Sequence, residues 1–479
     1  MTDELASLDA TAQADLVRRR QISPKELVEA AMARIEALNP TVNAVIHQTF
    51  DEARDAAASL GDRLAAGEAT GPLGAVPFLI KDIGATQAGL PYWSGNRALK
   101  ELDHRRNDDT VLGARFRRAG LVTLGKTNLP ELGSSPTTQP LSCGPTHNPW
   151  DLERSPAGSS GGSAAAVASG MVPLAHANDG GGSTRLPAAW CGLVGLKTTR
   201  GRVANPDTVS RLVSELVVTR TVRDTALVLD SVCGTTDADL FATAPPLGPY
   251  VDELGRVAAP LRVGLCLDGG QYPVDPGCVA AVEAAGSALE AAGHRVGPFD
   301  GSILFGPASA VNGRLWMAGI ARRVGHLGQL IGRELTEDEV EPYNWAAAQR
   351  GRTMLATEWV AAEEEQQSWV RRAIGSMEGV DLLVTPTAGC PPMRTADLEP
   401  PADKPWRIGR TYGMIGQFTL PFNVTGNPAI SLPLHTTDAG LPVGVQLVAP
   451  MGREDLLLRL SSHLERALPW AHRRPAVFA

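Results

Sequence analysis

Three glycines directly precede a serine in the run Asn178–Arg185, which reads NDGGGSTR. Residues without bulky side chains leave several backbone N–H groups unobstructed around the hydroxyl group of Ser183. Converging donors of this kind are what an oxyanion hole needs in order to stabilise the tetrahedral intermediate of acyl transfer. The run therefore indicates a serine that could attack a carbonyl carbon, with Gly180, Gly181 and Gly182 beside it.

A second run rich in glycine and serine, Ala157–Ser163, leads directly into an alanine-rich stretch at 164–168. That stretch predicts a helix whose free N–H groups point back into the loop. A flexible linker is one alternative, but a linker does not usually run straight into a strong helix. A phosphate-binding loop is another, and it is disfavoured because the Gly-Lys-Ser/Thr ending is missing.

A serine hydroxyl group is a weak nucleophile unless a neighbouring base removes its proton. Histidine is the first alternative, but Ser183 lies outside a Gly-x-Ser-x-Gly elbow and the sequence marks out no histidine partner. Lys81 is the other candidate, because it ends the apolar run Val76–Ile80 and a strand there could carry its amine inward. Burial lowers the pKa of a lysine, and a neutral amine can accept a proton. The alternative for Lys81 is a solvated lysine at the end of a strand.

Asp179 and Arg185 carry opposite charges on either side of the glycine run. One interpretation is an ordinary solvated ion pair. The interpretation we favour is a local brace that fixes the turn from Gly180 to Ser183 by charge-assisted hydrogen bonds. Neither side chain would take part in the chemistry directly.

Apolar runs and helical patterns alternate along the chain, which predicts an α/β fold with a mixed, largely buried central sheet. Ser23 is a predicted N-cap with Pro24 at the first helical position, and the pair Asn39-Pro40 predicts the end of that helix. Further helices are predicted at 10–20 and 110–119, and strands at 76–80, 121–124, 381–385, 429–433 and 443–448.

Composition changes along the chain without indicating separate domains. Residues 155–203 are rich in Gly, Ser and Ala, a composition typical of tight turns and close packing. Residues 308–377 have a helical hydrophobic pattern and predict a helical insertion that shapes a substrate pocket. Because no internal repeat or charged low-complexity tail is present, we expect residues 1–479 to form one domain.

The chain of 479 residues has a formal net charge of −8, and its basic residues are scattered. This distribution disfavours nucleic-acid partners and anionic membrane surfaces. Six widely spaced cysteines and nine histidines form no CxxC or HExxH pattern, so neither a disulfide framework nor a metal site is predicted. The first residues lack the pattern of a signal peptide, and a cytoplasmic location is expected.

Two segments resemble the amidase-signature family. The stretch AGSSGGSAAAVASGMVPLAHANDGGGSTRLPAAWCGLVGLKTTRGRV, from Ala157 to Val203, is similar to the signature itself. VPFLIKD resembles the upstream segment that supplies the lysine of the family, and Ser159 and Ser183 are 24 positions apart, as the family requires. Shorter similarities, GKTNLPE and LPFNVTGNPAISLP, extend the resemblance over nearly the whole chain.

The resemblance implies a mixed sheet covered by helices on both sides, and no cofactor. It makes Ser183 the nucleophile, Ser159 a bridging serine preceded by a cis peptide bond, and Lys81 the general base, with Ser160 as structural support. The oxyanion hole would use the backbone N–H groups of Gly180, Gly181, Gly182 and Ser183. Asn178 and Gly180 depart from the family, which often has Thr at the first position and Thr or Ile at the second. Because the hole uses backbone donors, these departures should alter the shape of the pocket and leave catalysis possible.

Further stretches, among them LIGRELTEDEVE and the final GREDLLLRLSSHLERALPWAHRRP, resemble the nylon-oligomer amidases of the family. They imply linear or cyclic amides of ω-amino acids, or aryl and alkyl amides, as small-molecule substrates. A carbamate hydrolase, an amidotransferase A subunit and an inactive binding protein stay open as alternatives, and a homodimer is one open assembly state. Candidate pocket residues are Thr137, Thr138, Gln139, Trp316, Met317, Tyr412 and Ile415; for the tryptophan and the methionine a place in the core is the alternative.

Overall fold

A mixed sheet of eleven strands runs through the computed structural model, which describes residues 2–205, 211–306, 308–401 and 403–479. The strands are β1 (Val45–Gln48), β2 (Pro77–Lys81), β3 (Val122–Thr127), β4 (Leu174–Asp179), β5 (Val194–Lys197), β6 (Ser214–Thr219), β7 (Arg262–Leu265), β8 (Arg295–Pro298), β9 (Leu382–Pro386), β10 (Ala429–Thr436) and β11 (Pro442–Val448). Their order across the sheet is β1-β3-β2-β4-β6-β5-β10-β11-β9-β7-β8. β2 is parallel to both β3 and β4, whereas β4 and β6 are antiparallel.

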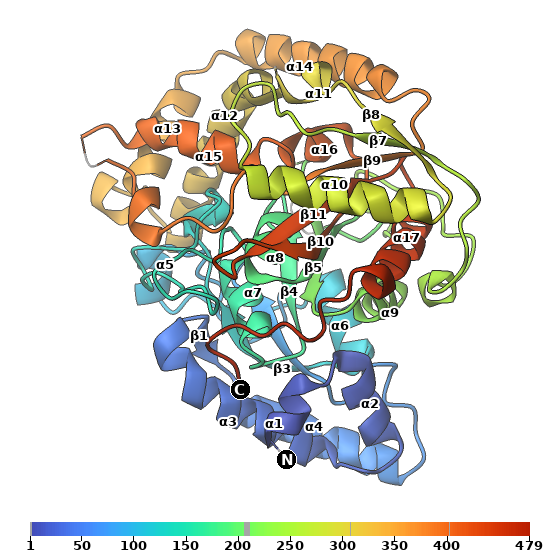
Figure 1. Cartoon of the computed structure of the whole chain (residues 1–479). Helices are drawn as coiled ribbons and strands as arrows, with labels where there is room; N and C mark the ends of the chain where they lie inside the picture. The colour runs from blue at the N-terminus through green and yellow to red at the C-terminus, as the bar shows by residue number, and fades with distance from the viewer. Residues whose placement is uncertain (1, 206–210, 307, 402) are drawn as a thin grey trace.

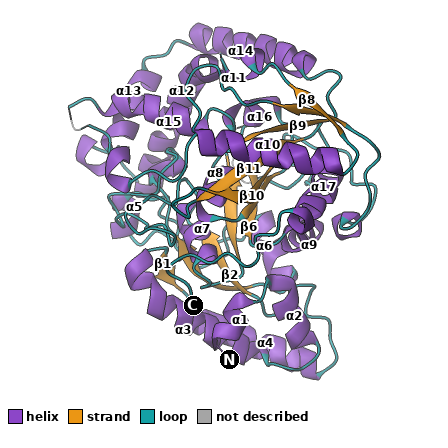
Figure 2. Cartoon of the chain, in the orientation of Figure 1, coloured by secondary structure: helices purple, strands orange, loops and turns teal. Residues whose placement is uncertain are grey.

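Helices surround the sheet (Figure 2). They are α1 (Thr2–Ser7), α2 (Ala10–Arg18), α3 (Pro24–Val42), α4 (Phe50–Ala65), α5 (Arg97–Glu101), α6 (Val111–Arg118), α7 (Gly161–Ala168), α8 (Arg185–Cys191), α9 (Val222–Val232), α10 (Pro276–Ala291), α11 (Ser302–Phe305), α12 (Ala308–Ile331), α13 (Pro342–Arg352), α14 (Ala356–Ser376), α15 (Gly409–Gly416), α16 (Leu420–Thr425) and α17 (Glu454–Ala467). The helices and strands predicted from the sequence are all present, with ends shifted by a few residues.

Strand β11 shows why helices cover both faces of the sheet. Side chains alternate between the two faces of a strand. Val445 and Leu447 belong to the same apolar core as Ala285 of α10. The intervening Gln446 faces the other way and accepts a hydrogen bond from Arg185 at the start of α8, at 2.7 Å. The predicted α/β class with a mixed sheet between helices is therefore confirmed.

Helix α3 begins as predicted but ends later. The Ser23 side chain accepts from the N–H of Glu26, whose carboxylate accepts from the N–H of Ser23 in return, so a complete capping box starts the helix. The predicted stop at Asn39 and Pro40 is wrong, because the helix continues to Val42. Pro40 lies inside the last turn of the helix, where its missing N–H removes one backbone hydrogen bond. The Asn39 side chain instead accepts from the backbone N–H groups that follow the helix.

Residues 308–377 are helical, as the hydrophobic pattern predicts, and consist mainly of α12, α13 and α14. These helices lie at the end of the molecule opposite the N-terminal helices α1 to α4 (Figure 1). No helix among the described residues combines the length and the apolar character needed to cross a membrane.

Candidate active site

Lys81 is the last residue of β2 and is fully buried. Its Nζ atom lies 2.7 Å from Oγ of Ser159 and 2.9 Å from Oγ of Ser160, and it donates to Oδ1 of Asn178 at 2.7 Å. Burial lowers the pKa of Lys81 to about 7, against a smaller opposing effect of the Glu215 and Asp179 carboxylates. The apolar strand thus brings the Lys81 amine into contact with two serines. Above neutral pH this amine is largely deprotonated.

Ser159 and Ser160 end the loop that precedes α7, and the peptide bond between Gly158 and Ser159 is cis. Ser160 Oγ also donates to the carbonyl oxygen of Asn178 at 3.3 Å. The Ser160 backbone N–H donates to the carbonyl oxygen of Ser183 at 3.2 Å. These bonds tie the loop of Ser159 to the turn that carries Ser183.

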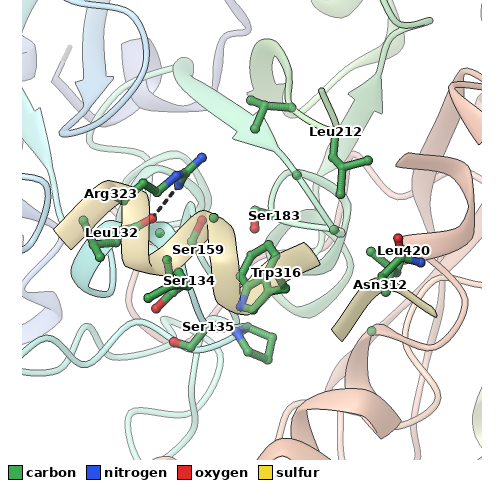
Figure 3. Close-up of a pocket in the computed structure, with 18 of the residues that line it drawn as sticks. Leu132, Ser134, Ser135, Ser159, Ser183, Leu212, Asn312, Trp316, Arg323 and Leu420 are labelled. Carbon is green, nitrogen blue, oxygen red and sulfur yellow. Dashed lines mark hydrogen bonds between the residues drawn. The ribbon is translucent and has the colours of Figure 1, made fainter. Parts of the chain in front are cut away.

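Ser183 lies in the turn between β4 and α8, and it lines the same cavity as Ser159 (Figure 3). Gly180 and Gly181 line this cavity as well. Gly182 is predicted to donate to the oxyanion, but in the structure its N–H donates to the Asp179 carboxylate at 2.6 Å. Its φ of +133° and the closeness of Thr419, 2.4 Å from the place of a Cβ atom, require glycine. Gly180, Gly181 and Ser183 stay as the predicted donors.

Asp179 and Arg185 form the brace that the sequence suggests. Both side chains are fully buried, and Arg185 donates to the two carboxylate oxygens of Asp179 at 2.8 and 2.9 Å. Burial by itself raises the pKa of Asp179, but the Arg185 guanidinium overcomes this effect and holds that pKa well below its usual range. The alternative of a solvated ion pair is excluded by this burial.

Replacing Arg185 with methionine is expected to lower the free energy of unfolding by about 3–5 kcal/mol, because the Asp179 carboxylate would stay buried without its partner. Urea unfolding measures this loss. Arg262→Met is the matched control, since it removes an arginine whose pair with Asp381 is exposed. The control should change stability by about 1 kcal/mol or less. Equal losses in the two variants would contradict the role of the brace.

The cavity that contains both serines has a volume of about 750 Å³. Trp316 and Arg323 of α12 lie over it, and the Arg323 guanidinium donates to the carbonyl oxygen of Leu132 at 3.0 Å (Figure 3). Leu212 and Leu420 add apolar wall on the side of Ser183. The cavity therefore offers an apolar space for a small organic molecule beside two hydroxyl groups.

Two of the seven predicted pocket residues, Trp316 and Tyr412, line this cavity. Met317 faces a different hollow, because a helix turns by about 100° per residue and carries it away from its neighbour.

The other four predicted pocket residues are not among those that line the cavity: Thr137, Thr138, Gln139 and Ile415. Ile415 is fully buried in an apolar cluster with Trp190. Thr138 is buried and donates to the carbonyl oxygen of Ala157 at 2.9 Å, so it supports the loop of Ser159 from behind.

Several lining residues were missed, and two signals could have found them. Arg323 follows Trp316 by seven positions, which places both on one face of a helix. Glu215 is a single charge in the otherwise uncharged strand Ser214–Thr219, where an ionised side chain needs a specific partner. Among the described residues, no group of three or more His, Cys, Asp or Glu side chains could hold a metal ion.

Residues 26–458 match the amidase family. The chain is 41% identical to a 6-aminohexanoate-cyclic-dimer hydrolase of Paenarthrobacter ureafaciens, with 98% of this chain and 96% of that protein aligned. It is 34% identical to an acylamidase of Rhodococcus erythropolis, with 99% of each covered. The structure of a 6-aminohexanoate cyclic dimer hydrolase complexed with substrate superimposes with a TM-score of 0.93 at 39% identity, covering 99% of this chain and 100% of that one.

The chain therefore belongs to the amidase family, and it is an amidase-signature hydrolase that acts on amide carbon–nitrogen bonds. The resemblance seen in its glycine- and serine-rich segments is confirmed.

Proposed function

We propose that this protein hydrolyses small amides of ω-amino acids, or aryl and alkyl amides, by a relay of Lys81, Ser159 and Ser183 through an acyl-enzyme. The observation that carries the proposal is the contact of 2.7 Å between the buried Lys81 amine and Ser159, in a cavity that also holds Ser183. An amine beside one hydroxyl group, with a second hydroxyl group facing the same space, is an arrangement suited to moving a proton away from a nucleophile.

The first half of the reaction forms the acyl-enzyme. Neutral Lys81 takes a proton from Ser159, which takes one from Ser183 as the Oγ atom of Ser183 attacks the carbonyl carbon. The negative charge that develops on the carbonyl oxygen is stabilised by backbone N–H groups of the Gly180–Ser183 turn. Ser159 then returns a proton to the nitrogen atom, the carbon–nitrogen bond breaks, and the amine leaves.

The second half releases the acid. A water molecule gives its proton to the same relay and attacks the acyl carbon, and Ser183 recovers its proton as the ester bond breaks. The apolar wall formed by Trp316, Leu212 and Leu420 supports an alkyl or aryl chain next to the carbonyl group. The names of the relatives, a cyclic-dimer hydrolase and an acylamidase, support the same two substrate classes.

Activity should rise with pH, because Lys81 accepts a proton only as the neutral amine. Burial lowers the pKa of Lys81 to about 7, so the neutral fraction grows as the pH rises through this value. For an anilide that does not itself titrate, kcat/KM should fall about tenfold per pH unit below about pH 6 and level off above about pH 8. A pH optimum below about 6 would contradict Lys81 as the base.

A panel of four substrates tests the proposed function: a primary amide, an anilide, a 6-aminohexanoate oligomer in linear and cyclic form, and an aryl carbamate. Release of the amine by the purified chain is measured for each. We expect kcat/KM for the anilide or the oligomer to exceed that for the carbamate. A preference for the carbamate would favour a carbamate hydrolase. Hydrolysis of glutamine that occurs only with a partner complex would favour an amidotransferase subunit. The absence of any turnover would favour a binding protein.

A further inference from the structure

A chain of buried polar groups extends from Lys81, and two of its members, Asn178 and Glu215, line the same cavity as Ser159. The Asn178 side chain accepts from Lys81 and donates through its Nδ2 atom to Oε1 of Glu215 at 3.2 Å. The other oxygen of Glu215 lies 2.6 Å from Nε2 of His176. Glu215 and His176 are buried as completely as Lys81 itself. Of these groups Asn178 contacts the lysine directly, and Glu215 and His176 follow it in the chain of hydrogen bonds.

Three adjacent strands fix this chain of groups. His176 and Asn178 are two residues apart on β4, so their side chains project from the same face. Glu215 on β6 lies directly opposite Asn178 in the antiparallel register. Lys81 ends β2, which pairs with β4 on its other side. The strand register therefore places His176, Asn178 and Glu215 together on one face, and Lys81 reaches Asn178 from the end of β2.

Gly84 supplies the space that the Asn178–Glu215 pair occupies. A Cβ atom on Gly84 would lie 2.6 Å from Oε1 of Glu215 and 2.8 Å from Nδ2 of Asn178. The residue also has a φ of +83°, a conformation that favours glycine. A side chain three residues after Lys81 would therefore displace the carboxylate from the amide.

We propose that Glu215 is a positioning residue which, through the Asn178 amide, holds the Lys81 amine against Ser159 and sets how readily that amine takes a proton. This inference rests on the proposed role of Lys81 as the base. Buried ionic and amide groups that bond to one another keep a single geometry, because a movement of any one of them would leave a buried polar group without its hydrogen-bond partner.

Among the charged groups near Lys81, Glu215 is the carboxylate that most directly favours the protonated amine. Asp179 is neutralised by its two bonds to Arg185, whereas Arg323 is a cation and opposes protonation of the lysine. Burial lowers the pKa of His176, against an opposing effect of its bond to Glu215. The charge of Lys126 also lowers the pKa of His176, and the Lys126 amine lies 3.8 Å from its own partner, Asp82.

The test is the pH dependence of kcat/KM in Glu215→Gln, which removes the charge but keeps the size of the side chain. Without the carboxylate the protonated form of Lys81 is less favoured, so the acid limb should move to lower pH by about one unit. Asn178→Thr, a substitution that suits a strand, should move the limb in the same direction because the shorter side chain lacks the amide that links Lys81 to Glu215. Glu454→Gln is the matched control, since Glu454 is another fully buried glutamate, which pairs with Arg202 and is not among the charges that shift the pKa of Lys81.

An acid limb that stays in place in both folded variants would overturn the role of Glu215, even if Lys81→Met is inactive. An equal shift in the Glu454→Gln control would overturn it as well. Failure of the underlying proposal has a different signature, because a Lys81→Met variant that kept its full rate and its acid limb would show that Lys81 is not the base at all. The expected result is a shift in Glu215→Gln and Asn178→Thr, no shift in Glu454→Gln, and a kcat at least about a hundredfold lower in Lys81→Met.

Discussion

Replacement of Ser183 with alanine is expected to lower kcat for anilide hydrolysis by at least about 10⁴-fold, since it removes the proposed nucleophile. The substitution removes a single oxygen atom from a side chain that lies in the turn after β4. The fold should therefore persist, and the circular dichroism spectrum and the urea midpoint should match those of the unchanged protein. Amine release under single-turnover conditions measures the loss.

Ser169→Ala is the control for this result. Ser169 is also buried and lies in the same signature segment, but its hydroxyl group donates to the carbonyl oxygen of Ala165 within the end of α7. Its replacement should leave kcat within about threefold of the starting value, because a lost neutral hydrogen bond affects stability more than chemistry. A Ser183→Ala protein that hydrolyses the anilide as fast as this control would rule out Ser183 as the nucleophile.

Lys81→Met should produce the second large effect, a fall in kcat of about 10²–10⁴-fold, which is the usual contribution of a positioned base. Methionine has a similar length and no charge, so it fills the site without the cost of burying an ammonium group. Residual activity should also lose the acid limb near neutral pH, because the group that titrates there is gone. Rates over pH 5 to 9 measure both changes.

Lys126→Met provides the comparison for this second variant. Lys126 is also fully buried and lies on β3, the neighbour of β2, but its amine faces Asp82 at 3.8 Å. Its loss should lower stability while the acid limb stays near pH 7, the value that Lys81 sets. If Lys81→Met kept both its rate and its acid limb, another group would have to be the base.

The sequence predicts the residues that meet in the site because the signals around them are local. An apolar run that ends in Lys81 predicts a buried amine, and consecutive glycines before Ser183 predict a turn that only small residues can form. The opposite charges of Asp179 and Arg185 flank the same turn, so their pairing can also be predicted from their short separation in the sequence. Strand and helix positions were found for the same reason.

The residues that the sequence misplaces depend on contacts between distant segments. Trp316 and Met317 differ by one helical step, and only the packing of α12 decides which of them faces the cavity. An apolar residue such as Ile415 suits both the core and the wall of a pocket. The sequence alone therefore does not show that Ile415 lies in the core. Gly182 loses its expected role because Asp179 turns back to accept its N–H, a contact that no spacing rule predicts.

Covalent labelling of the unchanged protein tests the central claim most directly. A fluorophosphonate is a phosphorus electrophile, and an activated serine displaces its fluoride to form a stable bond. The masses of the intact protein and of its peptides locate the label. The account predicts one label per chain, on the peptide that contains Ser183, with activity lost in proportion to labelling. An active protein that is inhibited with the label on another residue, or that stays fully active without a label, would contradict it.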